Sequence, residues 1–270
     1  MEHPSFLYGT AWKEERTSSL TLLALQHGFR GIDTANQRKH YFERAVGEGI
    51  LESGIPRSEL WLQSKFTYVR GQDHRLPYDP GASLPTQVRQ SIESTLENLQ
   101  TTYIDSYLLH GPWAREGWTA QDRDVWRTME EAYERGVLKK IGVSNCSLEQ
   151  VSALLQEARV PPSFVQNRCY ARTAWDKDIR EFCGNHNIVY QGFSLLTANR
   201  NIFQHPYMQE LCNRYQKTGP QIVFRFALAV GMLPLTGTSN AKHMQQDRNI
   251  FDFTLSNEEC RRLEHIAVRK

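Results

Sequence analysis

The stretch TQVRQSIESTLENLQTTYIDSYLLHGP (residues 86–112) contains the pattern that decides the fold. Apolar side chains in its first half recur every three or four residues, at Val88, Ile92, Leu96 and Leu99. This spacing predicts an amphipathic helix over 86–99. The second half contains a short apolar run, 104–109, without strict alternation, as expected of a parallel strand buried on both faces. A helix followed by such a strand is the repeating unit of parallel α/β proteins.

The same unit recurs on both sides of this stretch. Further strand-like runs lie at 6–8, 31–32, 60–62, 141–143, 164–165, 188–193 and 232–235. Helical patterns lie at 20–27, 125–134, 148–158, 179–186 and 221–230, and Ser147 and Ser256 occupy expected N-cap positions. About eight strand–helix units in 270 residues predict a single α/β domain, 1–270, folded as a (β/α)8 TIM barrel.

A closed barrel fits better than an open sheet, because no segment carries a dinucleotide-binding glycine fingerprint. The nearest candidate, Gly47–Glu48–Gly49, has Glu52 where the third glycine should stand and falls within a helical pattern. We interpret these glycines as packing positions. The chain also lacks a GxSxG elbow, an HExxH pair and a GxxxxGK[ST] loop, so serine hydrolase, zinc hydrolase and P-loop chemistry have no support, and no metal is expected.

Composition excludes several other classes. The 32 basic and 30 acidic side chains give a formal charge of +2, too small a bias for a protein that depends on nucleic-acid phosphates. No apolar run reaches 18 residues, and MEHPSFLYGT does not resemble a signal peptide. Five scattered cysteines suggest reduced thiols. We therefore expect a cytoplasmic protein with no membrane or nucleic-acid partner.

Ionisable and amide side chains stand at the carboxyl ends of successive predicted strands. They are Asp33, Lys65, His110, Ser144 with Asn145, and Gln166 with Asn167. In a barrel these positions converge on one face, where catalytic groups collect. A lysine that closes a buried strand needs a partner, and Asp33 lies one strand away. The long connections at 66–85 and 111–124 follow strands three and four on the same face.

At these residues the sequence resembles the aldo-keto reductase family, over nearly the whole chain. The matching segments are GFRGIDTANQRKHYFERAVGEGI (28–50), LQSKF, LLHGP, GVSN, VQN and LPLTGTSNAKHMQQD (233–247). The resemblance implies reduction of an aldehyde or ketone to an alcohol by hydride from NADPH. A tyrosine would act as general acid, its pKa lowered by Lys65, which Asp33 fixes, while His110 orients the carbonyl.

The catalytic loop departs from the family pattern. Most relatives carry the tyrosine five positions after the aspartate, where this chain has Arg38. Tyr41 stands eight positions after Asp33, and we assign it the acid role, with the adjacent His40 as the alternative proton donor.

The resemblance also implies a cofactor site. Ser144, Asn145 and Gln166 would hold the nicotinamide amide, and Phe193 would stack on its ring. The phosphate-binding segment would contribute Gly237, Thr238, Ser239, Asn240, Lys242, His243 and Gln246. His243 and Lys242 stand where an arginine usually binds the 2′-phosphate, so NADPH is expected and NADH remains possible.

Two further expectations concern the substrate. The last helical pattern ends near residue 267 of 270, so the sequence is identified as a short, atypical member without the family's C-terminal loop. Aromatic residues after predicted strands (Trp12, Tyr68, Tyr78, Trp113 and Trp118) suggest a bulky or aromatic small-molecule carbonyl substrate. Two alternatives stay open: a redox-neutral isomerase or lyase, and a non-catalytic, NADPH-binding regulatory protein.

Overall fold

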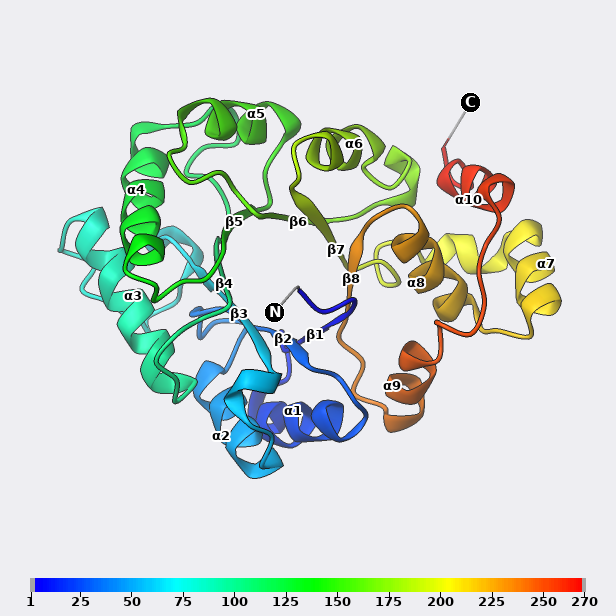
Figure 1. Cartoon of the computed structure of the whole chain (residues 1–270), viewed down its shortest axis with the longest axis horizontal. Helices are drawn as coiled ribbons and strands as arrows, with labels where there is room; N and C mark the ends of the chain where they lie inside the picture. Colours follow the sequence, from blue (N-terminus) through cyan, green and yellow to red (C-terminus); the bar gives the residue numbers. More distant parts are fainter. Residues whose placement is uncertain (1–2, 269–270) are drawn as a thin grey trace.

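A computed structural model describes residues 3–268 and contains a closed barrel of parallel strands in the order β1 to β8. The strands are β1 Leu7–Gly9, β2 Gly31–Asp33, β3 Trp61–Phe66, β4 Ser106–Leu109, β5 Ile141–Ser144, β6 Phe164–Arg168, β7 Val189–Phe193 and β8 Leu233–Thr236. Helices surround the ring of strands (Figure 1). The (β/α)8 barrel predicted from the sequence is confirmed.

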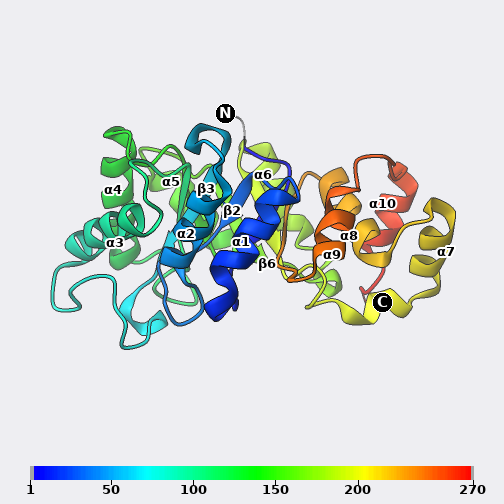
Figure 2. The same cartoon turned by 90° about the horizontal axis from the view of Figure 1, so that it is seen from below.

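Six helices fill the connections of the first seven strands: α1 Thr17–Gln26, α2 Glu43–Ser53, α3 Leu84–Asn98, α4 Ala120–Glu134, α5 Leu148–Glu157 and α6 Lys177–Asn185. The remaining helices are α7 Pro206–Tyr215, α8 Gly219–Ala229, α9 Ala241–Arg248 and α10 Asn257–Glu264, which gather at one side of the barrel (Figure 2). Short 3-10 helices lie at Glu14–Arg16, Arg57–Glu59, Val69–Gly71, Ala171–Thr173 and Arg200–Gln204. Within residues 3–268, none of the helices is both long enough and apolar enough to cross a membrane.

Alternation along the short strands divides the barrel wall into two faces. In β3, Leu62 and Phe66 pack in the large core between the strands and the helices. Trp61 instead joins a small core inside the barrel, together with Leu7, Leu108, Phe164, Leu233 and Leu235. Because side chains two apart share a face, Gln63 and Lys65 extend the Trp61 face toward the carboxyl end of β3. The barrel interior is therefore apolar at one end and polar at the other.

Local signals in the sequence set several helix starts. Ser147 and Ser256 each form a capping box, in which the serine hydroxyl accepts the N–H of Gln150 or Glu259 and that side chain accepts the serine N–H. Helix α7 is not among the helices predicted above. It buries only Tyr207, Met208 and Leu211, which is too short a pattern for periodicity to detect.

Gly47 and Gly49 lie in α2 and serve close helix packing, as interpreted from the sequence. A Cβ added to Gly47 would lie 2.0 Å from the Asn98 carbonyl oxygen at the end of α3. A Cβ added to Gly49 would lie 2.5 Å from the Ser18 carbonyl oxygen in α1. Both contacts are with backbone atoms, which cannot rotate away as a flexible side chain could. Helix α2 thus approaches its neighbours as closely as glycine allows.

We predict that Gly47→Ala lowers the free energy of unfolding by about 1–3 kcal/mol, because the new methyl group forces α2 and α3 apart. Gly184→Ala in α6 is the matched control, since a Cβ there meets no atom within 4 Å. This control should leave stability unchanged or raise it by up to ~1 kcal/mol through helix propensity. Urea denaturation of both variants measures the difference, and equal stabilities would contradict the packing argument.

Candidate active site

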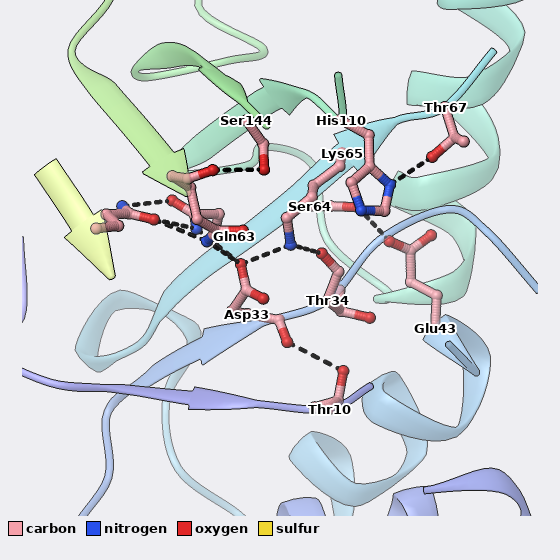
Figure 3. Close-up of polar contacts among 12 residues, drawn as sticks. Thr10, Asp33, Thr34, Glu43, Gln63, Ser64, Lys65, Thr67, His110 and Ser144 are labelled. Atoms are coloured by element: carbon pink, nitrogen blue, oxygen red, sulfur yellow. Dashed lines mark hydrogen bonds and ion pairs between the residues drawn. The ribbon is translucent and has the colours of Figure 1, made fainter. Parts of the chain in front are cut away.

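A buried ion pair lies at the polar end of the barrel (Figure 3). The Lys65 Nζ atom is 2.7 Å from Asp33 Oδ1 and 2.7 Å from the Thr34 carbonyl oxygen. The lysine is fully buried and Asp33 is only 3% exposed. Neither charge is free to reach bulk water, so each depends on the other and on nearby dipoles.

Glutamine side chains form a hydrogen-bonded network around the Asp33 carboxylate. Gln63 and Gln166 donate to Asp33 Oδ1 at 2.7 and 3.0 Å, and both also donate to Gln191 Oε1. Gln191 returns a hydrogen bond to Gln63 Oε1 at 2.9 Å. Gln63 and Gln191 were not singled out in the sequence. For Gln63, the available signal in the sequence was its position two residues before Lys65, which places both side chains on the same face of the strand.

The β2–α2 loop places Tyr41 above this ion pair. The Tyr41 ring centroid is 5.3 Å from Lys65 Nζ and 5.9 Å from the His110 ring centroid. The loop is tied to the β3–α3 connection, because Gln37 donates to the Gly71 carbonyl at 2.6 Å and Gln72 donates to the Asn36 carbonyl at 2.8 Å. The longer loop is therefore held at several points.

Protonation of Tyr41 differs from the expectation stated above. Burial, and secondly the Asp33 carboxylate, raise the pKa of Tyr41 above its ordinary value. Burial likewise lowers the pKa of Lys65, against the pull of Asp33. The predicted lowering of the phenol pKa is thus wrong for this structure. Burial disfavours a phenolate, and the nearby Asp33 carboxylate disfavours it further. Tyr41 is held as a neutral phenol with its proton in place.

His110 is also held neutral. Burial, then the charges of Lys65 and His40, lower its pKa to about 3. Its Nδ1 atom is 2.7 Å from Thr67 Oγ1. Since this hydroxyl has no other hydrogen-bond partner among residues 3–268, we infer that it donates to Nδ1. A neutral imidazole that accepts at Nδ1 carries its proton on Nε2. His110 can then donate that proton in a hydrogen bond.

Two cavities meet at these side chains. The larger has a volume of about 750 Å³ and is bounded by the ends of β1, β2 and β5 to β8. The smaller, about 340 Å³, lies between the β2–α2, β3–α3 and β4–α4 connections. Both are lined by Trp12, Tyr41, His110 and Asn145. Of these two cavities, His40 lines only the smaller one. Its ring centroid is 4.0 Å from that of Trp12.

Most of the predicted cofactor residues line the large cavity. It is lined by Ser144, Asn145, Gln166, Phe193, Gly237, Thr238, His243 and Gln246. Ser239, Asn240 and Lys242 are exposed and do not line it. Asn240 instead caps α9, where its side-chain oxygen accepts the N–H groups of Lys242 and His243. The backbone N–H groups of Lys242 and His243 are therefore already hydrogen-bonded within the chain.

Lys13 is a site residue that the sequence analysis missed. It follows β1, is 9% exposed and lines the large cavity. Its Nζ atom donates to the Gly237 carbonyl, and it forms no ion pair with any described residue. Burial lowers its pKa to about 8. A buried ammonium without a carboxylate partner fits an anionic ligand such as a dinucleotide phosphate. Its position just after a strand was the available signal.

Three of the predicted pocket aromatics, Tyr78, Trp113 and Trp118, lie elsewhere. Tyr78 is buried, and its hydroxyl donates to the Thr67 carbonyl at 2.5 Å. Trp118 is buried against Trp126. The Trp113 ring centroid lies 4.7 Å from the Arg70 guanidinium. None of the three lines the two cavities described above, so their predicted substrate contact is wrong. Tight turns in the connections fold the Tyr78 and Trp118 rings inward, where they bury more apolar surface than at a rim.

Comparisons with known proteins agree with this geometry. The sequence model of the Aldo/keto reductase family matches residues 8–268. A 9,11-endoperoxide prostaglandin H2 reductase of Trypanosoma cruzi is 28% identical over 94% of this chain and 83% of its own. A glyoxal reductase of Bacillus subtilis is 29% identical over 89% and 80%. The crystal structure of an aldo/keto reductase from Brucella melitensis has a TM-score of 0.82 at 25% identity and covers 97% of this chain and 94% of that one.

We predict that His110 remains neutral, with its proton on Nε2, down to about pH 4. Imidazole ¹⁵N chemical shifts distinguish both the charge and the tautomer. Thr67→Val removes the donor at nearly constant volume, so the Nε2–H preference should weaken, whereas Thr67→Ser should retain it. An unchanged tautomer in Thr67→Val would contradict the proposed direction of this hydrogen bond.

Proposed function

This chain belongs to the Aldo/keto reductase family, and we propose that it reduces an aldehyde or ketone with a nicotinamide cofactor, using Tyr41 as the proton donor. One observation carries the proposal. Tyr41 and His110 form a wall shared by the large cavity, which suits a dinucleotide, and the small cavity, which suits a substrate. A carbonyl group at this junction would meet both a hydride source and an acid.

The cofactor would lie in the large cavity. When bound, it supplies the hydride that reduces the carbonyl carbon. Ser144, Asn145 and Gln166 would hold the carboxamide, and Phe193 would cover the ring face. Lys13 would pair with a phosphate, in keeping with its burial and its lack of a carboxylate partner. Gln166 is well placed as an acceptor, because its amide N–H groups are occupied by Asp33 and Gln191.

In this proposal, side chains of the protein supply the proton to the carbonyl oxygen. The raised pKa of Tyr41 keeps the phenol protonated at neutral pH, so an acid is always present at the carbonyl oxygen. His110, neutral and donating from Nε2, would orient and polarise the same oxygen. As the phenol gives up its proton, the Lys65 ammonium 5.3 Å from its ring would stabilise the developing negative charge.

Tyr41 fits the acid role better than His40 does. His40 is stacked on Trp12, and its Nδ1 atom is 2.9 Å from Gln37 Oε1. It does not line the large cavity. The position of Tyr41 also supports an enzyme over a non-catalytic protein, because the longer loop still directs a phenol to the junction. The glyoxal reductase and the prostaglandin H2 reductase reduce small molecules, as their names state, and support a reductive activity here.

We expect Tyr41→Phe to reduce kcat for carbonyl reduction by about 10²–10⁴-fold, the usual contribution of a general acid. The Kd of NADPH should change little, because the lost hydroxyl is not part of the proposed cofactor grip. His40→Gln is the matched control and should keep near-wild-type turnover. Steady-state kinetics and cofactor fluorescence measure the two quantities. If His40→Gln loses turnover while Tyr41→Phe keeps it, His40 rather than Tyr41 is the proton donor.

The preference for NADPH over NADH should be modest, less than about a thousandfold, or roughly 4 kcal/mol. His243 offers one donor where an arginine fork is usual, and Lys242 does not line the cavity. Asp247, a buried carboxyl on the same helix, also lines the cavity and opposes added negative charge once it ionises.

Kinetic constants for both cofactors test this preference. His243→Arg should raise it by restoring a two-pronged cation, whereas Lys242→Met should leave it nearly unchanged. A strong wild-type preference that Lys242→Met abolishes would show that the exposed lysine, rather than His243, reaches the 2′-phosphate.

A further inference from the structure

The small cavity has an unusual balance of charge. Arg70, from the β3–α3 connection, is the one permanently charged side chain among the described residues that line it, and these residues include no aspartate or glutamate. The other ionisable groups at this cavity are held neutral. Burial lowers the pKa of His110 to about 3, and burial also lowers the pKa of His40. A substrate would therefore meet one positive charge and no negative charge.

Arg70 is held in place but has no counter-ion. Its Nη2 atom donates to the Pro112 carbonyl at 2.7 Å. Its guanidinium lies 4.7 Å from the Trp113 ring centroid and 5.8 Å from that of Tyr68. Within residues 3–268 no carboxylate lies within 4 Å of it, and its Nε and Nη1 atoms make no hydrogen bond. Nη2 has a second N–H group, so one of the two bidentate edges of the guanidinium, Nε with Nη2 or Nη1 with Nη2, remains available.

The Asp122 carboxylate, which contacts the residues beside Arg70, already has other hydrogen-bond partners. Asp122 accepts the Tyr68 hydroxyl at 2.9 Å and the Trp113 backbone N–H at 2.6 Å. It also accepts both the backbone N–H and the hydroxyl of Thr119 in the capping box of α4. Asp122 therefore holds the rings that support Arg70 without neutralising the guanidinium.

We propose that the substrate is a carbonyl compound that also bears a carboxylate, which Arg70 binds while Tyr41 and His110 engage the carbonyl oxygen. This inference rests on the proposed reductase function and adds the substrate class. Arginine binds carboxylate through two parallel hydrogen bonds, and the fork left open at Arg70 has this geometry. The Trp12 and Tyr68 rings in the same lining suit a flat spacer between the two groups.

The test compares 4-carboxybenzaldehyde with 4-formylbenzamide, a neutral analogue of nearly the same shape, under fixed NADPH. Wild-type kcat/KM should be about tenfold higher for the carboxylate, a moderate factor because Arg70 is exposed to solvent. Arg70→Met should bring the ratio close to one, mainly through a higher KM for the carboxylate. Arg89→Met, which changes an arginine on the outer face of α3 paired with Glu131, is the matched control and should keep the wild-type ratio.

Two outcomes would overturn the proposal: equal efficiency with both aldehydes in the wild type, or a ratio that Arg70→Met leaves unchanged. If the wild type turns over neither aldehyde, this result would count against the reductase function instead. Binding of 4-(hydroxymethyl)benzoate by calorimetry then decides the anion site separately. The wild type should bind it about tenfold more tightly than Arg70→Met does. Equal affinities would reject the role of Arg70 whatever the reaction.

Discussion

The buried Lys65–Asp33 ion pair is the constraint on which the polar half of the barrel depends. An unpaired charge at either position would cost several kcal/mol, so the surrounding strands must supply compensating dipoles. Gln63, Gln166 and Gln191 meet this need from β3, β6 and β7. The apolar interior core closes the opposite end of the barrel, so that water has no access to this network from that side. One pair thus fixes side chains on strands far apart in the sequence.

The same pair influences what its neighbours can do. Burial is the main reason that Tyr41 remains a neutral phenol and His110 a neutral imidazole, and the Asp33 carboxylate adds to the effect on the pKa of Tyr41, as the Lys65 ammonium does on that of His110. Both side chains can then donate hydrogen bonds at neutral pH, which is the state that the proposed carbonyl reduction requires. In the proposed reaction, the Lys65 ammonium would interact most strongly with the tyrosine oxygen as negative charge develops there.

Sequence patterns predicted most of the fold and the strand-end part of the site. Buried parallel strands and amphipathic helices leave periodic signals, and Asp33, Lys65 and His110 each close an apolar run. Lys13 escaped notice because the KEER segment (13–16) resembles a solvated surface, and its burial arises only from tertiary packing against Gly237. The pKa of Tyr41 was mispredicted for a related reason. It depends on burial and on the distance to Asp33, which no local pattern encodes.

The extra length between Asp33 and Tyr41 does not loosen the site, because the loop is anchored where it meets its neighbours. Gln37 contacts the Gly71 carbonyl on one side and His40 on the other, and Asn36 donates to the Ser91 carbonyl of α3 at 3.0 Å. Gly71 ends the 3-10 helix that contains Arg70. The segment that carries the proposed acid and the segment that carries the free guanidinium are therefore joined by hydrogen bonds. Placement of the carbonyl and of a distal anion would thus be set by one linked pair of loops.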